Sequence, residues 1–235
     1  GLCPPDGGEL SVLGRNPRRE RKRLMVDVGY IADVGILPRW MRVHQLLRFV
    51  AGVHPTFDRQ AAERALAETE VRLNARISSL STGMAVQLHL SIVAAIGAKL
   101  LVLDEPTLGL DILFRRRFFE QLLNDYFDGE RTIIISTHQV EEVQNILTDV
   151  MFMDRGKLIL HKSMAALEEE FVELHAVGDS LEKALSIPHV GARSILGGKA
   201  IIYEGIEPES LAPLGEIRSP SVSDLFVAKL GGGHA

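Results

Sequence analysis

The most informative stretch of this chain is Leu100-Leu-Val-Leu-Asp104-Glu105-Pro106-Thr107-Leu108-Gly109-Leu110-Asp111. Its first four residues are apolar, which is typical of a strand buried in a parallel sheet. Asp104 and Glu105 follow directly, and carboxylates in such a place are costly to bury without a metal ion or hydrogen-bond donors. One carboxylate can hold Mg²⁺ through its water shell, and the other can polarise an attacking water. The stretch therefore predicts a pair of carboxylates at a strand end, an arrangement typical of nucleotide hydrolases.

A second apolar strand, predicted over residues 132–136, ends in Ser136-Thr137-His138. In a parallel sheet both strand ends reach the same edge, which is where ligands bind in α/β folds. A lone histidine is most often a satisfied core residue. At the end of a neighbouring strand, His138 becomes a candidate contact for a γ-phosphate.

Upstream, the segment Leu80-Ser81-Thr82-Gly83-Met84 precedes an apolar helix that we predict over residues 86–96. Serine with glycine at a helix N-terminus offers free backbone N–H groups and the positive end of the helix dipole, which together favour an anion. The alternative is that Ser81 only caps the helix. Its position 23 residues before Asp104 favours the anion site.

The order of elements predicts an α/β domain with a mainly parallel sheet, because buried strands alternate with helices. We place this domain over residues 1–168, with a helical subdomain over about 41–97. Short strands and helices follow, and they predict a small C-terminal α+β accessory domain over 169–235. Alternation over residues 9–13 also predicts a short strand, and the spacing over 140–147 predicts a helix.

Composition excludes several classes of protein. Hydrophobic residues make up 46% and charged residues 24% of the 235 residues, which is typical of a globular protein. The single cysteine, Cys3, excludes an internal disulfide framework. The net charge of −5 argues against bulk binding to nucleic acid. Without a signal peptide or an apolar run long enough to span a membrane, we expect a soluble cytoplasmic protein.

In order and spacing, these motifs resemble those of the ATP-binding subunits of ABC transporters. Residues 80–84 match the family's signature motif, 100–105 its Walker B strand, 108–111 its D-loop and His138 its switch histidine. The resemblance extends from residue 1 to about 165. Met84 in place of the family's glutamine, together with the C-terminal appendage, is most like the exporter-type (ABC-2) subgroup.

The resemblance implies a P-loop NTPase-like fold and a head-to-tail homo- or heterodimer that binds ATP and Mg²⁺ between its protomers. It implies transmembrane permease subunits as partners, and a cytoplasmic, peripheral position at the inner face of the membrane. The roles it implies are Mg²⁺ binding through water for Asp104, general base for Glu105, γ-phosphate contact for His138, a grip on the partner's γ-phosphate for Ser81 and Gly83, and a place in the dimer seam for Asp111.

Two departures from the family pattern stand out. Asp33 follows Val28-Gly-Tyr-Ile-Ala at the Q-loop position, where the family often has glutamine. Aspartate is shorter and has no amide donor, although some members carry acidic residues there, so the change does not exclude activity. The phosphate-loop pattern Gly-x-x-x-x-Gly-Lys-Ser/Thr is absent, because Leu158 and Ala200 follow the two Gly-Lys pairs. We expect this loop upstream of Gly1, in which case the chain holds half an ATP site and is inactive alone.

Two alternatives stay open. The first is a catalytically silent ABC subunit that lends Ser81 and Gly83 to a partner's ATP site without hydrolysing ATP at its own. The second is a soluble, non-transport ABC ATPase of DNA repair or translation. The repair type needs long coiled-coil arms and the translation type usually two linked cassettes, and neither pattern is visible here.

Overall fold

The computed structural model describes residues 3–31, 37–108, 112–126 and 129–231. Contacts divide the chain into two compact units, Gly1–His138 and Gln139–Ala235. The domain boundary predicted between residues 168 and 169 lies inside the second unit and stays a prediction. Within the described residues, no helix is both long and apolar enough to cross a membrane.

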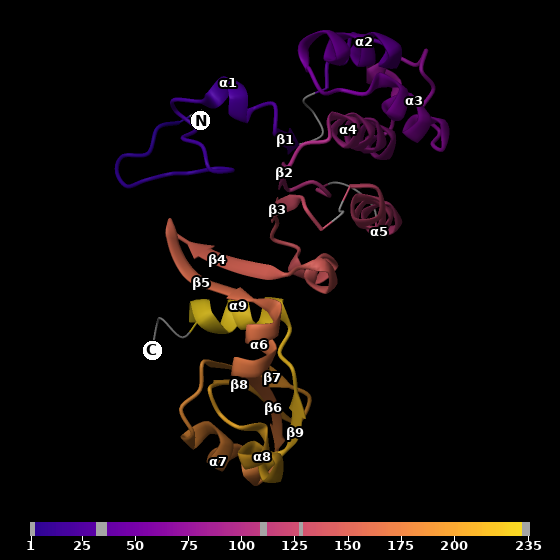
Figure 1. Ribbon diagram of the computed structural model, residues 1–235. Coiled ribbons are helices and arrows are strands. Elements are labelled where there is room, and N and C mark those ends of the chain that lie inside the picture. Colours follow the sequence, from indigo (N-terminus) through magenta and orange to yellow (C-terminus); the bar gives the residue numbers. More distant parts are fainter. Residues whose placement is uncertain (1–2, 32–36, 109–111, 127–128, 232–235) are drawn as a thin grey trace. The chain divides into compact units, whose positions relative to one another are not determined.

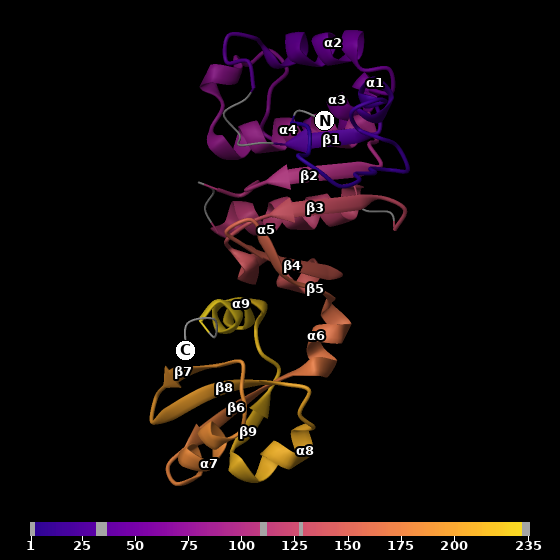
Figure 2. The same ribbon diagram turned by 90° about the vertical axis from the view of Figure 1, so that its left-hand side faces the viewer.

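The first unit is built on a parallel sheet in the order β1-β2-β3. Its strands are β1 (Val28–Ile31), β2 (Leu100–Asp104) and β3 (Thr132–Ser136). Figure 2 shows them side by side and pointing the same way. Leu101 and Leu103 are fully buried on one face, whereas Tyr30 and Ile134 on the other are 49% and 41% exposed. The predicted mainly parallel sheet is confirmed.

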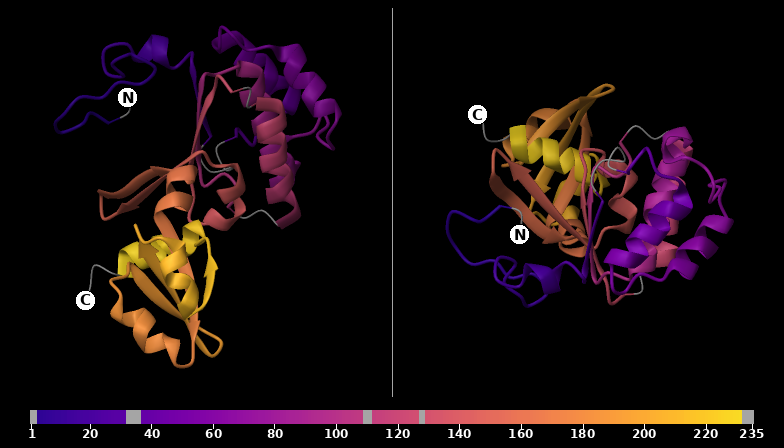
Figure 3. Two further views of the ribbon diagram at one scale, coloured as in Figure 1. Left: turned by 60° about the horizontal axis from the view of Figure 1, so that its bottom comes forward. Right: turned by 90° about the horizontal axis from the view of Figure 1, so that it is seen from above.

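Two helices lie on the buried face of this sheet, as Figures 1 and 3 show. They are α4 (Thr82–Ile96) and α5 (Ile112–Gln121), which continues as a π-helical turn, η3 (Leu122–Tyr126). Ser81 is the N-cap of α4 and Gly97 is its C-cap. Gly97 has a φ of 65°, in the left-handed conformation with which many helices end at a glycine. A Cβ on Gly29 of β1 would lie 3.3 Å from Val93, so helix and strand pack closely.

A helical layer packs against the other side of α4. It consists of α2 (Val43–Val53), α3 (Arg59–Ala67) and the short η2 (Ile77–Ser79). Their apolar faces share one core with α4, formed around Val43, Leu47, Leu66 and Leu88. Apolar side chains on α4 therefore face both the sheet and this layer, which explains why the segment reads as apolar on all sides.

The N-terminal segment differs from its prediction. No strand forms over residues 9–13, where a single bridge joins Val12 to Arg15 around a turn with positive φ at Leu13 and Gly14. Alternation alone is not enough, because a strand needs a partner to satisfy its backbone. The chain then forms α1 (Arg21–Leu24). Arg15 pairs with Asp27 before β1 at 2.5 Å, and this hydrogen bond holds the pKa of the Asp27 carboxyl below its usual value.

The second unit starts with two 3₁₀ turns, η4 (Val140–Glu142) and η5 (Gln144–Ile146), where we predicted a helix over 140–147. Val143, with φ −114°, interrupts the helical path between them. β-Branched residues at 140, 143 and 146 lower helix propensity there. A hairpin of β4 (Asp149–Asp154) and β5 (Lys157–Ser163) follows, and its turn has positive φ at Arg155 and Gly156, which is typical of a tight hairpin.

The rest of this unit is a four-stranded antiparallel sheet in the order β7-β8-β6-β9. In chain order the elements are α6 (Met164–Glu170), β6 (Phe171–Val177), α7 (Ser180–Ser186), β7 (Gly191–Ile195), β8 (Gly198–Glu204), α8 (Pro208–Leu211), η6 (Ala212–Leu214), β9 (Glu216–Arg218) and α9 (Val222–Gly231). From β6 to β9 this is a β-α-β-β-α-β arrangement. The predicted small α+β fold is confirmed.

Helices lie on both faces of this sheet (Figure 1), and each face has its own hydrophobic core. Leu174 and Tyr203 lie in the core that α7 and α8 cover, and the buried Tyr203 hydroxyl donates to the carbonyl of Ala184 at 2.8 Å. Phe171 and Leu225 lie in the other core, beneath α9 and the hairpin. Each face of the sheet is thus closed by elements of the same unit.

Candidate functional site

The carboxyl end of β2 turns sharply at Glu105. This residue has φ 45°, in the left-handed region that side chains other than glycine seldom adopt. It also precedes Pro106, and its carbonyl accepts the N–H of Leu108 at 3.1 Å to close the turn. Backbone conformations of this kind cost about 1–3 kcal/mol and concentrate at functional sites.

Glu105 and His138 are brought together, as their positions at neighbouring strand ends predict. The backbone N–H of His138 donates to Glu105 Oε1 at 3.1 Å, and Nδ1 of its ring lies 2.8 Å from the same oxygen. An ionised carboxylate can only accept, so Nδ1 carries the proton and Nε2 is left for another partner. The side chains are 32% and 63% exposed, so a ligand can reach both from solvent.

Asp104 is held by two hydroxyl groups from the flanking strands. Ser136 Oγ donates to Asp104 Oδ1 at 2.5 Å, and the Tyr30 hydroxyl donates to Oδ2 at 3.3 Å. Partial desolvation, and then the negative charge of Asp104, raise the pKa of the Tyr30 phenol above its usual value. Sequence reasoning missed Ser136 and Tyr30 as site residues, although both lie next to predicted ones.

Ser81 and Gly83 lie at the start of α4. Ser81 Oγ accepts the N–H of Met84 at 3.2 Å, so Ser81 does cap the helix, and it remains exposed. Among the residues that the structure describes, no hydrogen bond or ion pair joins these two to Asp104, Glu105 or His138. The described contacts therefore do not join the two halves of the predicted site.

The remaining predicted site residues, Asp33 and Asp111, lie outside the described residues. Within the described part of the chain, no group of three or more histidine, cysteine, aspartate or glutamate side chains could form a metal site. Mg²⁺ does not need one, because it keeps several waters and is commonly held by one or two carboxylates together with substrate phosphates. The donor set at the end of β2 fits Mg²⁺ in that form, with Asp104 as the carboxylate.

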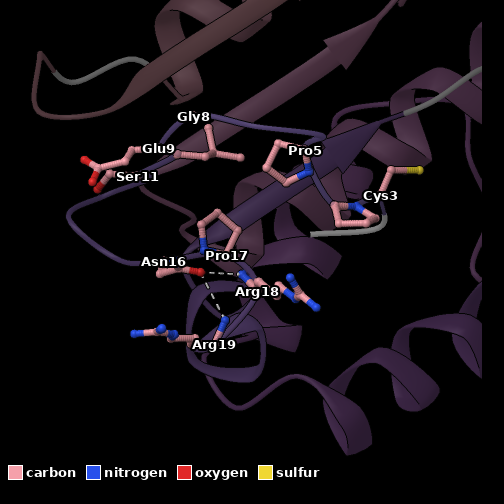
Figure 4. A pocket seen from close by; sticks show the side chains of 11 residues that line it. Cys3, Pro5, Gly8, Glu9, Ser11, Asn16, Pro17, Arg18 and Arg19 are labelled. Carbon is pink, nitrogen blue, oxygen red and sulfur yellow. Dashed lines mark hydrogen bonds between the residues drawn. The ribbon is translucent and has the colours of Figure 1, made fainter.

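A surface pocket lies in the N-terminal segment (Figure 4). Its lining includes Pro5, Pro17 and Arg18. Asn16 Oδ1 accepts hydrogen bonds from the backbone N–H groups of Arg18 at 3.0 Å and Arg19 at 3.2 Å. The Asn16 side chain therefore stabilises the local backbone. None of the predicted site residues lines this pocket, and we assign no function to it.

Comparison with known proteins gives no matching family model. The Nod factor export ATP-binding protein I of Rhizobium sp. (strain N33) is 28% identical over 250 residues, which cover 98% of this chain and 81% of that protein. A solved ATP binding subunit of an ABC transporter has a TM-score of 0.63 at 20% identity and covers 72% of each chain. The structure of cbiO1 from Clostridium perfringens, part of the ABC transporter complex cbiONQ, has a TM-score of 0.58 at 23% identity, covering 69% of this chain and 68% of its own.

The structural likeness shows the fold, which is that of an ABC ATPase domain of the P-loop NTPase class, as predicted. The sequence likeness extends over nearly the whole chain, including the C-terminal β-α-β-β-α-β region. This chain is a homologue of the ATP-binding proteins of ABC transporters, and its relatives are consistent with the exporter type.

Proposed function

We propose that this chain is the ATP-binding, ATP-hydrolysing subunit of an ABC transporter, and that it couples hydrolysis to export through separate membrane subunits. The observation that carries the proposal is the pairing of Glu105 with His138 beside the hydroxyl-held Asp104 at one sheet edge. Two carboxylates and an imidazole at the carboxyl ends of neighbouring parallel strands are suited to phosphoryl transfer to water.

The roles of the residues follow from their contacts. When bound, Mg²⁺·ATP supplies the electrophilic γ-phosphoryl group and the charge that Asp104 balances. Glu105 Oε1 is engaged by both His138 donors, so Oε2 is the oxygen that can accept a proton from a water. We assign His138 Nε2 to a contact with a phosphate oxygen. We assign the Q-loop position to Asp33 on the family pattern alone.

The second half of the site belongs to a partner protomer in this proposal. Among the described residues, Ser81 and Gly83 have no bond to Asp104 or Glu105, which supports their use on the nucleotide of another ABC domain. Backbone N–H groups at the start of α4, a 15-residue helix, favour a phosphate there. We place Asp111 in the seam between the two domains, which form a homo- or heterodimer.

We further propose that the partners are transmembrane permease subunits, and that the protein is cytoplasmic and peripheral at the inner face of the membrane. The relative in Rhizobium is a Nod factor export ATP-binding protein, and cbiO1 is part of an ABC transporter complex, which supports a membrane partner here. The net charge of −5 does not favour nucleic acid as a partner.

The test is the Glu105→Gln substitution in the native protein, purified with its membrane partners. We expect ATP binding to be kept and ATP turnover to be lost, because the amide is nearly isosteric but cannot take the proton from water. Equilibrium binding and phosphate release measure the two separately. Unchanged turnover would remove Glu105 from the role of base.

A second candidate is a catalytically silent ABC subunit that lends Ser81 and Gly83 to another subunit's nucleotide. The observation in its favour is that Ser81, exposed at the start of α4, makes no described hydrogen bond to Asp104, Glu105 or His138. The two candidates differ in where substitutions act. In a silent subunit Glu105→Gln leaves the turnover of the complex unchanged, whereas a substitution at Ser81 lowers it.

A further inference from the structure

The carboxylate of Asp104 is fixed from both sides by hydroxyl groups. Ser136 Oγ, on β3, donates to Oδ1 at 2.5 Å, and the Tyr30 hydroxyl, on β1, donates to Oδ2 at 3.3 Å. Each oxygen of the carboxylate thus receives one donor from a different neighbouring strand. Two donors on two oxygens determine both the direction of the side chain and the plane of the carboxylate.

The register of the parallel sheet places these donors. Asp104 and Ser136 are direct partners across β2 and β3. Tyr30 is the partner of Val102 across β1 and β2, two residues before Asp104 and on the same face of β2. A diagonal neighbour at that spacing is within reach of an aromatic side chain. Because the three side chains share one face, a one-residue slip of either flanking strand would remove the arrangement.

Hydroxyl groups are chemically suited to positioning a carboxylate for a cation. Each carboxylate oxygen has two acceptor sites, so one donor on each leaves another site free. Unlike lysine or arginine, a hydroxyl does not neutralise the charge, and in the described part of the chain no basic side chain pairs with Asp104. The carboxylate is therefore oriented but keeps its full charge for a cation or its water shell.

Ser136 also links the two carboxylates of the site. Its carbonyl accepts the backbone N–H of Glu105 at 3.0 Å, while its hydroxyl holds Asp104. Substitution by alanine keeps the carbonyl and removes only the hydroxyl. The Ser136→Ala variant therefore separates the orientation of Asp104 from the turn at Glu105.

We propose that Tyr30 and Ser136 are positioning residues that orient the Asp104 carboxylate for Mg²⁺, through one hydroxyl hydrogen bond to each of its oxygens. The proposal rests on the proposed function, because it takes the Mg²⁺ role of Asp104 as given. It adds two residues to the site and states which step they affect, namely the affinity for the divalent cation and not the affinity for the nucleotide itself.

The first experiment tests the hydrogen bonds without nucleotide. Double-mutant cycles pair Ser136→Ala, and separately Tyr30→Phe, with Asp104→Ala, and urea denaturation measures stability. We expect the paired changes to be non-additive by about threefold or more in the equilibrium constant for unfolding. The control is Thr132→Val on β3, which removes an exposed hydroxyl on the same face as Ser136 and should be additive with Asp104→Ala. Additive effects for Ser136 and Tyr30 would overturn the proposal.

The second experiment measures the affinity for Mn²⁺ in the presence of ATP, by electron paramagnetic resonance of free Mn²⁺, in the native protein. We expect Ser136→Ala to weaken Mn²⁺ binding by about tenfold, as is usual when a group that orients a metal ligand is lost. Tyr30→Phe should weaken it less, since its hydrogen bond is longer. Binding of ATP without metal should be unchanged, and Ser136→Thr, which restores a hydroxyl, should recover the affinity.

The outcomes separate the two proposals. If the wild type binds no Mn²⁺ with ATP, the proposed function fails, and the metal role of Tyr30 and Ser136 fails with it. If the wild type binds and both variants bind equally well, the proposed function stands and the positioning role is overturned. If the substitutions weaken ATP binding equally with and without metal, the positioning role is also overturned, because that result indicates a general structural role of the two residues.

Discussion

Glu105 holds a backbone conformation that its side chain disfavours. Its φ of 45° lies in the left-handed region, and it precedes Pro106. The turn is held from both sides, by the Glu105 N–H on the Ser136 carbonyl and by the Leu108 N–H on the Glu105 carbonyl. These hydrogen bonds maintain the strained backbone at Glu105, and the turn places its carboxylate next to His138.

We predict that Glu105→Gly is more stable than Glu105→Ala by about 1 kcal/mol. Both variants lose the carboxylate, but only glycine adopts the left-handed region without a Cβ penalty. The usual order is the reverse, because glycine loses more backbone entropy on folding. Urea denaturation of the two variants measures the difference. Leu108, which has no positive φ, is the control, and there alanine should be the more stable. Equal stability of the two Glu105 variants would mean that the turn relaxes.

His89 makes the fold sensitive to acid. It lies on α4, where its Nδ1 atom is buried without a hydrogen-bond partner among the described residues, and burial lowers its pKa to about 4. Unfolded, the ring titrates near 6.5. Between these pH values the unfolded chain binds the proton and the folded chain does not, so stability falls as the pH falls through this range.

We predict a loss of about 3 kcal/mol between pH 7 and pH 4 from this group. In a His89→Leu variant that part of the loss should disappear, while acid loss from carboxylates remains. Urea denaturation at several pH values measures it, with His161→Gln, at an exposed histidine on β5, as the control. If the wild type and His89→Leu lose stability in parallel, the ring is not held neutral by burial.

Single residues of the site were predictable to different degrees. Asp104, Glu105 and His138 follow from pattern alone, because the ends of parallel strands converge at one edge, and the structure does bring Glu105 and His138 into contact. Tyr30 and Ser136 do not, because their hydrogen bonds depend on the register between strands far apart in sequence. The functional roles themselves stay predictions.

The start of α4 has two candidate roles at one side chain. Ser81 caps the helix, and the proposed function also places it on a phosphate. Serine to aspartate separates the two, because aspartate caps as well as serine does but brings a negative charge. Alanine does the opposite, since it removes the cap without adding charge.

We predict that Ser81→Ala lowers the stability by about 1 kcal/mol, whereas Ser81→Asp leaves it near the wild type. In the native protein Ser81→Asp should nevertheless abolish ATP-driven dimerisation, because its carboxylate repels the γ-phosphate. Urea denaturation and analytical ultracentrifugation measure the two effects. Ser163, which caps α6 by the same bond to a backbone N–H, is the matched control, and Ser163→Asp should affect neither. Normal dimerisation of Ser81→Asp would count against the phosphate role.

Among the elements, the strand β3 agrees with its predicted bounds residue for residue. The two failures have different causes. The strand over 9–13 has no partner among the described residues, and the helix over 140–147 is broken into 3₁₀ turns at Val143. In both segments the side-chain pattern matched the predicted element, but the backbone could not form it. Residues 9–13 have no partner strand among the described residues, and the backbone at Val143 leaves the helical path.

At the scale of the whole molecule, three hydrophobic cores each lie within one of the two compact units. The core of the helical layer lies wholly within Gly1–His138, and both cores of the C-terminal sheet lie wholly within Gln139–Ala235. The sequence predicted a break thirty residues later, where the texture changes from an α/β to an α+β pattern. Residues of the hairpin β4–β5 and of α6 share a core with α9, a contact between segments far apart in sequence that a local pattern does not show, and the boundary at 168/169 stays a prediction.

We predict that residues 139–235 fold alone, with one cooperative thermal transition by circular dichroism, because both of their cores are complete. Residues 169–235 should not, or should melt well below it. They lack Val150, Phe152, Leu160 and Leu167, which fill the core beneath α9, and loss of a single such side chain commonly costs about 2–5 kcal/mol. Phe152→Ala in the longer fragment should move its melting temperature toward that of the shorter one. If residues 169–235 melt cooperatively at the same temperature as 139–235, the boundary at 168/169 is correct and the hairpin contributes nothing to that fold.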